Sequence, residues 1–171
     1  MRNLKGLSVI IVLLSAAGCA VANYWYSPLT AVPVGPAGPP SMLSVSPLSP
    51  GPSTALKVTA VSPVSENDFQ WVLLGLAVPS VTVKGIKTCY QVQTSSPGST
   101  YISQVRLTRM TTPDTALVVH DDPANLTATS PTCSTSPANV KVEGTITLEM
   151  KMVFGSASDI IRIGGIELLT E

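Results

Sequence analysis

The segment from Thr145 to Phe154 alternates between apolar and polar residues along most of its length. One side of the alternation carries Ile146, Leu148, Met150, Met152 and Phe154, and the other carries Thr145, Thr147, Glu149 and Lys151. Successive side chains of a β-strand point to opposite faces, so this order predicts a strand with one face buried and one face solvated. A chain that contains such a strand needs a second layer to cover the apolar face.

The same period of two recurs along the C-terminal two thirds of the chain. Further strands are predicted over residues 70–78, 81–93, 101–108, 115–120 and 160–169. Turn sequences rich in Pro, Gly and Asp separate several of them, as at Ser96-Pro97-Gly98 and Asp122-Pro123. Many short strands at this spacing favour an all-β fold. We therefore expect residues 66–171 to form an antiparallel β-sandwich, most simply a jelly roll.

Glycines mark two positions where the alternation changes phase. Val83 and Ile86 are both apolar although one is odd and the other even, and Gly85 lies between them. Gly164-Gly165 separates Ile163 from Ile166 in the same way. An extra residue in one strand of a pair produces such a shift, so both positions predict β-bulges.

The N-terminus has the pattern of an export signal over residues 1–22. Arg2 and Lys5 precede an apolar run, Leu7 to Ala17, which is too short for a membrane-spanning helix. Residues 16–19, Ala-Ala-Gly-Cys, resemble a bacterial lipobox, and this resemblance implies lipidation of Cys19 and a cell-surface or outer-membrane lipoprotein. Cleavage after Ala22 is the alternative, and it implies a secreted or periplasmic protein.

The chain has three cysteines. An odd number is awkward in an oxidising compartment, and setting Cys19 aside leaves Cys89 and Cys133 as a pair. We expect a disulfide between them that pins the loop 123–137 over an outer face of the sandwich, with two buried free thiols as the alternative. Lys87, Cys89, Gln91 and Gln93 are expected on this solvent side of their strand.

Prolines are concentrated between residues 27 and 63. Proline fixes φ and lacks the N–H that a sheet ladder needs, so residues 23–65 are predicted to form a flexible Pro/Ser-rich tether. The aromatic triplet Tyr24-Trp25-Tyr26 at its start has two readings, either a membrane-interface contact or a cluster without a role.

Composition argues against several functions. Ten Lys and Arg balance ten Asp and Glu, so no basic field is available to bind nucleic acid. The single histidine, in His120-Asp121-Asp122, is the only local concentration of catalytic residue types, and no G-x-S-x-G elbow supplies a nucleophile. We expect no catalytic residues and no cofactor. A small hydrolase built around His120 is the least favoured alternative.

Two sets of side chains are candidates for ligand binding. Trp71, Tyr90 and Tyr101 would form a sugar-stacking platform if they share an exposed face, although rings at such positions also serve as core. Oxygen ligands for Ca²⁺ are weak candidates, because no acidic calcium loop is present. They are Asp114, Asp121, Asp122 and Asn125.

Taken together, these features predict a non-catalytic, surface-displayed domain with a structural or adhesive role. A carbohydrate-binding module is the alternative. The final strand, Ile160 to Leu169, resembles the closing strand of many extracellular jelly-roll modules, but this resemblance carries no functional residues across. The expected partners are a glycan or a cell-surface protein, and a membrane if Cys19 carries a lipid.

Overall fold

A computed structural model describes residues 22–36, 41–48, 55–112 and 115–171. The predicted export signal, with the lipobox at 16–19, lies outside the described residues apart from Ala22. Within the described part of the chain, no helix has the length and apolar character needed to cross a membrane.

The described chain is built from strands with one short 3₁₀ helix. Their bounds are β1 Tyr24–Tyr26, η1 Pro28–Thr30, β2 Val32–Val34, β3 Leu43–Pro47, β4 Leu56–Ala60, β5 Trp71–Gln93, β6 Tyr101–Thr112, β7 Thr115–Asp122, β8 Thr132–Val153 and β9 Ile160–Thr170. All strand pairs are antiparallel. The expected all-β class is therefore confirmed.

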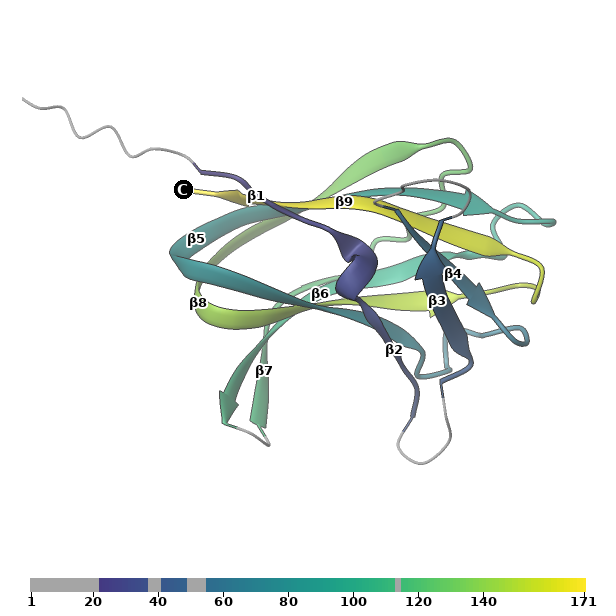
Figure 1. Ribbon diagram of the computed structural model, residues 1–171, viewed down its shortest axis with the longest axis horizontal. Helices are drawn as coiled ribbons and strands as arrows, with labels where there is room; N and C mark the ends of the chain where they lie inside the picture. Colours follow the sequence, from purple (N-terminus) through teal and green to yellow (C-terminus); the bar gives the residue numbers. More distant parts are fainter. Residues whose placement is uncertain (1–21, 37–40, 49–54, 113–114) are drawn as a thin grey trace, which may run out of the picture.

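Hydrogen bonding connects all nine strands, and the connected sheet folds over into two layers (Figure 1). The first layer has the order β2–β5–β8–β6–β7 and uses the beginning of β5 and the end of β8. The second layer has the order β8–β5–β9–β4–β3 and uses the other halves of the two long strands. β1 pairs with β9 in this second layer. The result is a β-sandwich of jelly-roll type.

β5 and β8 pass from one layer to the other through bulges at the corner. The register between them shifts between Val78 and Val81 and again between Val83 and Gly85. Gly144, which pairs with Val78, has a φ of 77°, a backbone conformation that side chains other than hydrogen disfavour. The predicted bulge at Gly85 is confirmed, and a shift in the β5–β9 register confirms the one at Gly164-Gly165.

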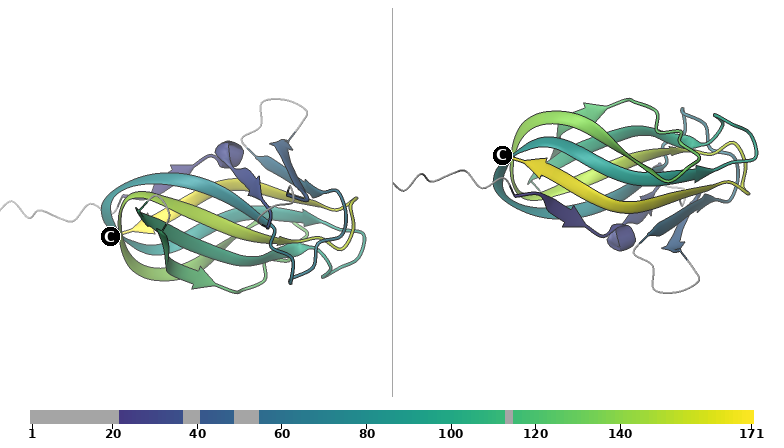
Figure 2. Two further views of the ribbon diagram at one scale, coloured as in Figure 1. Left: turned by 90° about the horizontal axis from the view of Figure 1, so that it is seen from below. Right: turned by 90° about the horizontal axis from the view of Figure 1, so that it is seen from above.

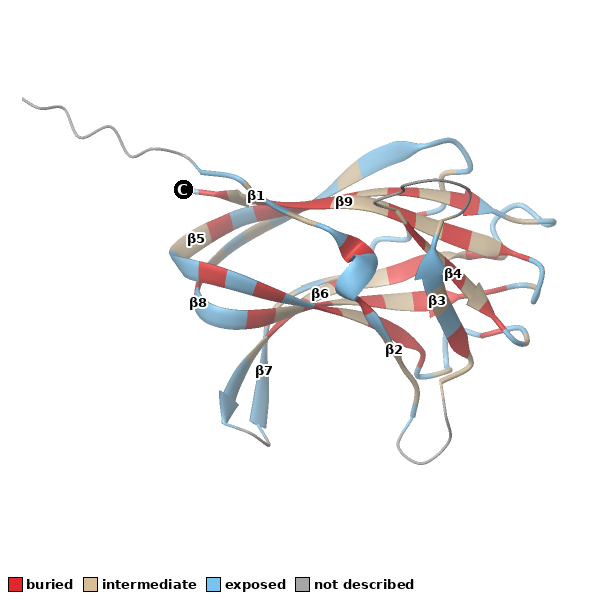
Figure 3. Ribbon diagram, viewed as in Figure 1, coloured by how far each residue is buried: buried red, intermediate tan, exposed pale blue. Residues whose placement is uncertain are grey.

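Buried residues occur along the strands of both layers (Figure 3), and the apolar ones form one core between the layers. In β8 the alternation behaves as predicted, because Ile146, Leu148, Met150 and Met152 are fully buried. The opposing layer contributes Ile86, Val92, Ile161, Ile163, Ile166 and Leu168. In sheet-on-sheet packing of this kind, alternate residues of a core strand face the opposite layer.

The prediction of a flexible tether over residues 23–65 is wrong for the residues of this segment that the structure describes. They form β1 to β4, which lie against the second layer and along β5 (Figure 2). Leu56, Val58 and Ala60 alternate into the core. Prolines are tolerated here because Pro33 and Pro47 lie in β2 and β3, which pair on one side only, where a missing N–H breaks no ladder.

Cys89 and Cys133 form the predicted disulfide. Both lie on the outer side of the second layer, where the alternation of β5 placed them, since Thr88 and Tyr90 on either side of Cys89 are buried. The bond does not pin a separate loop. Residues 132–137 belong to β8, and Cys133 pairs directly with Cys89 across neighbouring strands.

Candidate binding site

The outward side of the second layer carries a set of polar and charged side chains. β5 contributes Lys87, Cys89 and Gln91, and β9 contributes Arg162 and Glu167. The register places Lys87 beside Glu167 and Gln91 beside Arg162. We call this surface the β5–β9 face.

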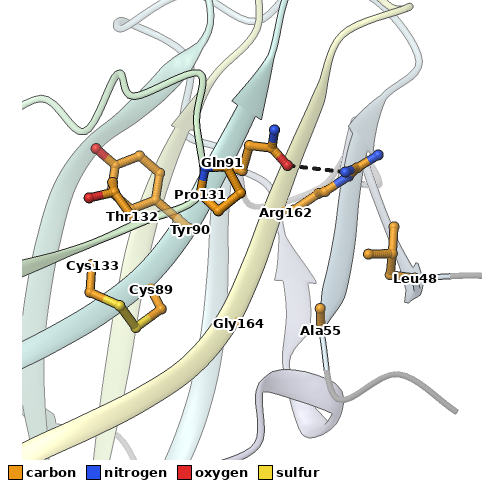
Figure 4. Close-up of a pocket in the computed structure, with 10 residues that line it drawn as sticks. All are labelled: Leu48, Ala55, Cys89, Tyr90, Gln91, Pro131, Thr132, Cys133, Arg162 and Gly164. Atoms are coloured by element: carbon orange, nitrogen blue, oxygen red, sulfur yellow. Dashed lines mark hydrogen bonds between the residues drawn. A yellow bond between two sulfur atoms is a disulfide. The ribbon is translucent and has the colours of Figure 1, made fainter.

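A groove of about 350 Å³ lies on the β5–β9 face (Figure 4). Ligand pockets usually begin at roughly 300 Å³, so its size suits part of a small ligand or one unit of a longer one. It is lined by Leu48, Ala55, Cys89, Tyr90, Gln91, Pro131, Thr132, Cys133, Arg162 and Gly164. Four segments that are distant in the sequence therefore meet there. They are the region predicted to be a tether, β5, the beginning of β8 with Pro131 before it, and β9.

The polar part of the groove is fixed by a chain of two hydrogen bonds. Arg162 Nη1 donates to Gln91 Oε1 at 3.0 Å (Figure 4). Gln91 Nε2 donates to the carbonyl oxygen of Thr129 at 3.0 Å. The cross-strand pairing of Gln91 with Arg162 brings the two side chains together. Both amino-acid types can donate hydrogen bonds to hydroxyl or carboxylate oxygens, so this pair is suited to polar recognition.

An exposed tryptophan lies further along the same face. Trp25 of β1 pairs with Glu167 of β9, and 58% of its surface remains exposed. Its ring lies against Gly165, where an added Cβ atom would be 3.0 Å from the indole, so any larger residue would require the ring to shift. Gly164, the residue before Gly165, lines the groove. The ring of Trp25, which lies against Gly165, is therefore next to the groove.

Charged side chains hold Trp25 in place. Lys87 Nζ lies 5.2 Å from the centroid of the Trp25 ring, within the range of a cation–π contact. The same ammonium donates to Glu167 at 3.0 Å, and Asn23 donates to the other carboxylate oxygen at 2.9 Å. The ring is thus oriented by neighbours while much of it stays open to solvent.

The three aromatic residues predicted as a platform do not share an exposed face. Tyr90 borders the groove, but it is buried, and its hydroxyl accepts a hydrogen bond from the Ala128 amide. Trp71 lies on the outward side of the other layer, where it is 4% exposed. Tyr101 is half-buried and donates to Glu66. The platform prediction is therefore wrong as a set.

Trp71 is buried because other side chains cover it. The guanidinium carbon of Arg106 lies 4.9 Å from the centroid of its ring, and the ring of Phe69 packs at 5.9 Å. Arg106 is held there by ion pairs with Asp121 and Glu149. The alternation of side chains along β5 directs Trp71 outward, but it does not predict that Arg106 and Phe69 cover the ring.

The surroundings of His120 do not provide the geometry of a hydrolase. His120 Nε2 lies 2.7 Å from Ser136 Oγ, but no carboxylate among the described residues hydrogen-bonds the ring. The nearby cavity, which Ser136 and Asp122 line, has a volume of about 10 Å³ and has no room for a substrate. His120 and Ser136 come from opposite layers, so their hydrogen bond joins the layers.

The candidate calcium ligands that the structure describes have other partners or remain apart. Asp121 accepts from Gln104 and Arg106, and Asp122 accepts from the Ala124 amide. Asp114 lies outside the described residues. In the described ranges, no three His, Cys, Asp or Glu side chains gather closely enough to hold a metal ion.

No protein-family model and no curated protein matches this chain. Among solved structures, a family 4 carbohydrate-binding module is similar with a TM-score of 0.50 and 12% identity, over 85% of this chain and 89% of that one. The isomalto-dextranase of Arthrobacter globiformis T6 is similar with a TM-score of 0.52 and 15% identity, over 85% of this chain. The chain shares their β-sandwich fold. It spans only 23% of the length of the dextranase.

Of the residues that line the groove, only Tyr90 is among the predicted ligand-binding residues, and the aromatic neighbour of the groove, Trp25, is not. Gln91 was correctly placed on the solvent side of its strand, whereas Arg162 and Trp25 were not connected with it. The signal that was present is the pair Gly164-Gly165, because two glycines inside a strand often mark a close approach of another group.

Proposed function

We propose that this chain is a non-catalytic domain that binds a glycan on the β5–β9 face. The observation that carries the proposal is the exposed ring of Trp25 beside a groove that contains the Arg162–Gln91 pair. Two solved β-sandwich structures of carbohydrate-active proteins support the choice of ligand class by analogy alone.

The chemistry of the face suits a sugar. A pyranose ring presents an apolar C–H face that packs on an aromatic ring, and its rim carries hydroxyl groups that need donors and acceptors. Trp25 offers the aromatic surface, while Gln91, Thr132 and Arg162 offer polar groups. Arg162 and Gly165 are three positions apart along β9, a spacing of about 10 Å, so the surface is extended enough for an oligosaccharide.

Loss of glycan binding by a Trp25→Ala variant is the first test. The full chain is applied to a glycan array, and its best ligand is titrated by calorimetry against the wild type and two variants. We expect Trp25→Ala to weaken binding about ten-fold or more, because the stacked ring supplies much of the contact. Phe69→Ala is the matched control, since Phe69 is 54% exposed but lies beside Trp71 of the other layer.

The control should bind within about two-fold of the wild type. Weakening by Phe69→Ala alone would place the ligand on the other layer and contradict the site. A wild-type chain that binds no glycan on the array would contradict the function.

We further propose that the domain is displayed outside the cytoplasm on a lipid attached to Cys19. The export signal over residues 1–22 and the Cys89–Cys133 disulfide support an oxidising location. Cys19→Ser should release the protein from the membrane fraction into the soluble fraction, because acyl chains supply the attachment. A wild-type protein that begins at Asn23 and partitions into the aqueous phase of a detergent extraction would contradict lipidation.

A further inference from the structure

Arg162 is a cation without a counter-ion among the described residues. Its side chain makes one hydrogen bond in that part of the chain, to the neutral amide of Gln91, whereas Lys84, Lys87 and Arg106 all form ion pairs. Its Nε is buried and has no acceptor. An arginine in such surroundings is short of the hydrogen-bond acceptors that its planar guanidinium can use.

The groove around Arg162 is otherwise uncharged. Besides Arg162, its described lining has no charged side chain and consists of Leu48, Ala55, Tyr90, Gln91, Pro131, Thr132, Gly164 and the disulfide. Lys57 pairs with Arg162 across β4 and β9, and its register places a second cation on the same face. The nearest acidic group on the face, Glu167, already accepts from Lys87 and Asn23. The groove therefore has a positive charge and mostly apolar walls.

We infer that the groove selects an acidic glycan and that the guanidinium of Arg162 binds the carboxylate of a uronate unit. This inference rests on the proposed glycan-binding function and specifies its ligand class. Guanidinium and carboxylate are both planar, and a charge-assisted pair between them is about twice as strong as a neutral hydrogen bond.

Paired acidic and neutral oligosaccharides test this inference on the full chain. Each oligomer of galacturonate, glucuronate or mannuronate is compared with its carboxyl-reduced counterpart, which has the same rings and linkages without the charge. We expect at least one acidic oligomer to bind ten-fold or more tightly than its counterpart, and we expect this preference to weaken as salt is raised.

Substitution of Arg162 assigns the preference to that residue. Arg162→Gln should bind the acidic and reduced oligomers with equal affinity, because it removes the charge that distinguishes them. Arg162→Lys should keep only part of the preference, because an ammonium cannot bind the carboxylate through a planar fork. Arg109→Gln is the matched control, since it removes the same charge from β6 in the other layer.

The outcomes separate this inference from the proposed function. Equal wild-type binding of acidic and reduced oligomers, or an unchanged preference in Arg162→Gln, would overturn the inference while leaving glycan binding in place. Failure of every oligomer and every array glycan to bind would overturn both. Thermal unfolding checks that Arg162→Gln is folded. If it is not, Arg162→Lys and the salt dependence of the wild type decide the inference.

Discussion

At the scale of single residues, Asp159 shows how the ends of the sandwich are held. It is 2% exposed immediately before β9, and it accepts hydrogen bonds from the hydroxyls of Thr94 and Thr100 and from the Ser95 amide. Burial by itself raises the pKa of this carboxyl, but the hydrogen bonds to its charged form outweigh burial and hold the pKa below its ordinary value. The ionised Asp159 therefore stabilises the turn that precedes β6.

The Asp159→Asn variant should lose this stabilisation. Hydrogen bonds to a charged group contribute about 2 kcal/mol to the free energy of unfolding, so we expect a loss of about that size near neutral pH. Folding lowers the pKa of Asp159, so its contribution is complete above the unfolded-state pKa and disappears as pH falls through the folded-state pKa. Urea unfolding should show the gap between wild type and variant narrowing from about pH 7 to about pH 3. An equal gap at both pH values would contradict this assignment.

At the scale of elements, β4 is the segment whose prediction and structure differ most. It pairs with β3 on one side and β9 on the other, and Val58 is fully buried. The alternation of Leu56, Val58 and Ala60 was readable in the sequence, but the surrounding prolines favoured a tether. Composition describes the average of a whole segment, whereas a five-residue strand such as β4 depends on the residues at a few positions. The proline content of the segment therefore does not predict β4.

Hydrogen exchange distinguishes the strand from a tether. Amides of β4 that donate to β3 or β9 should exchange orders of magnitude more slowly than those of an unstructured peptide, because exchange requires opening of the sheet. Amides of β9 serve as an internal reference for the same layer. If the β4 amides exchanged at the rates of an unstructured peptide while the β9 amides stayed protected, the result would contradict the structure and support the predicted tether.

At the scale of the whole molecule, sequence patterns predicted the architecture better than the site. Period-two alternation, the phase changes at Gly85 and Gly164-Gly165, and the pairing of Cys89 with Cys133 all follow from local chemistry. The groove depends on which strands become neighbours. Trp25 and Gly165 are far apart in the sequence and meet only because β1 pairs with β9. No local sequence pattern predicts the register between β1 and β9.

The two tryptophans of the chain, one on the outer side of each layer, allow the most direct test of glycan binding on the β5–β9 face. The full chain, labelled with ¹⁵N, is titrated with its best array glycan, and the two indole N–H resonances are followed by nuclear magnetic resonance. Trp25 is exposed beside the groove and Trp71 is covered by Arg106 and Phe69. We predict that the Trp25 indole resonance shifts to saturation while the Trp71 resonance stays in place. A saturable shift of Trp71 with an unchanged Trp25 would contradict the account.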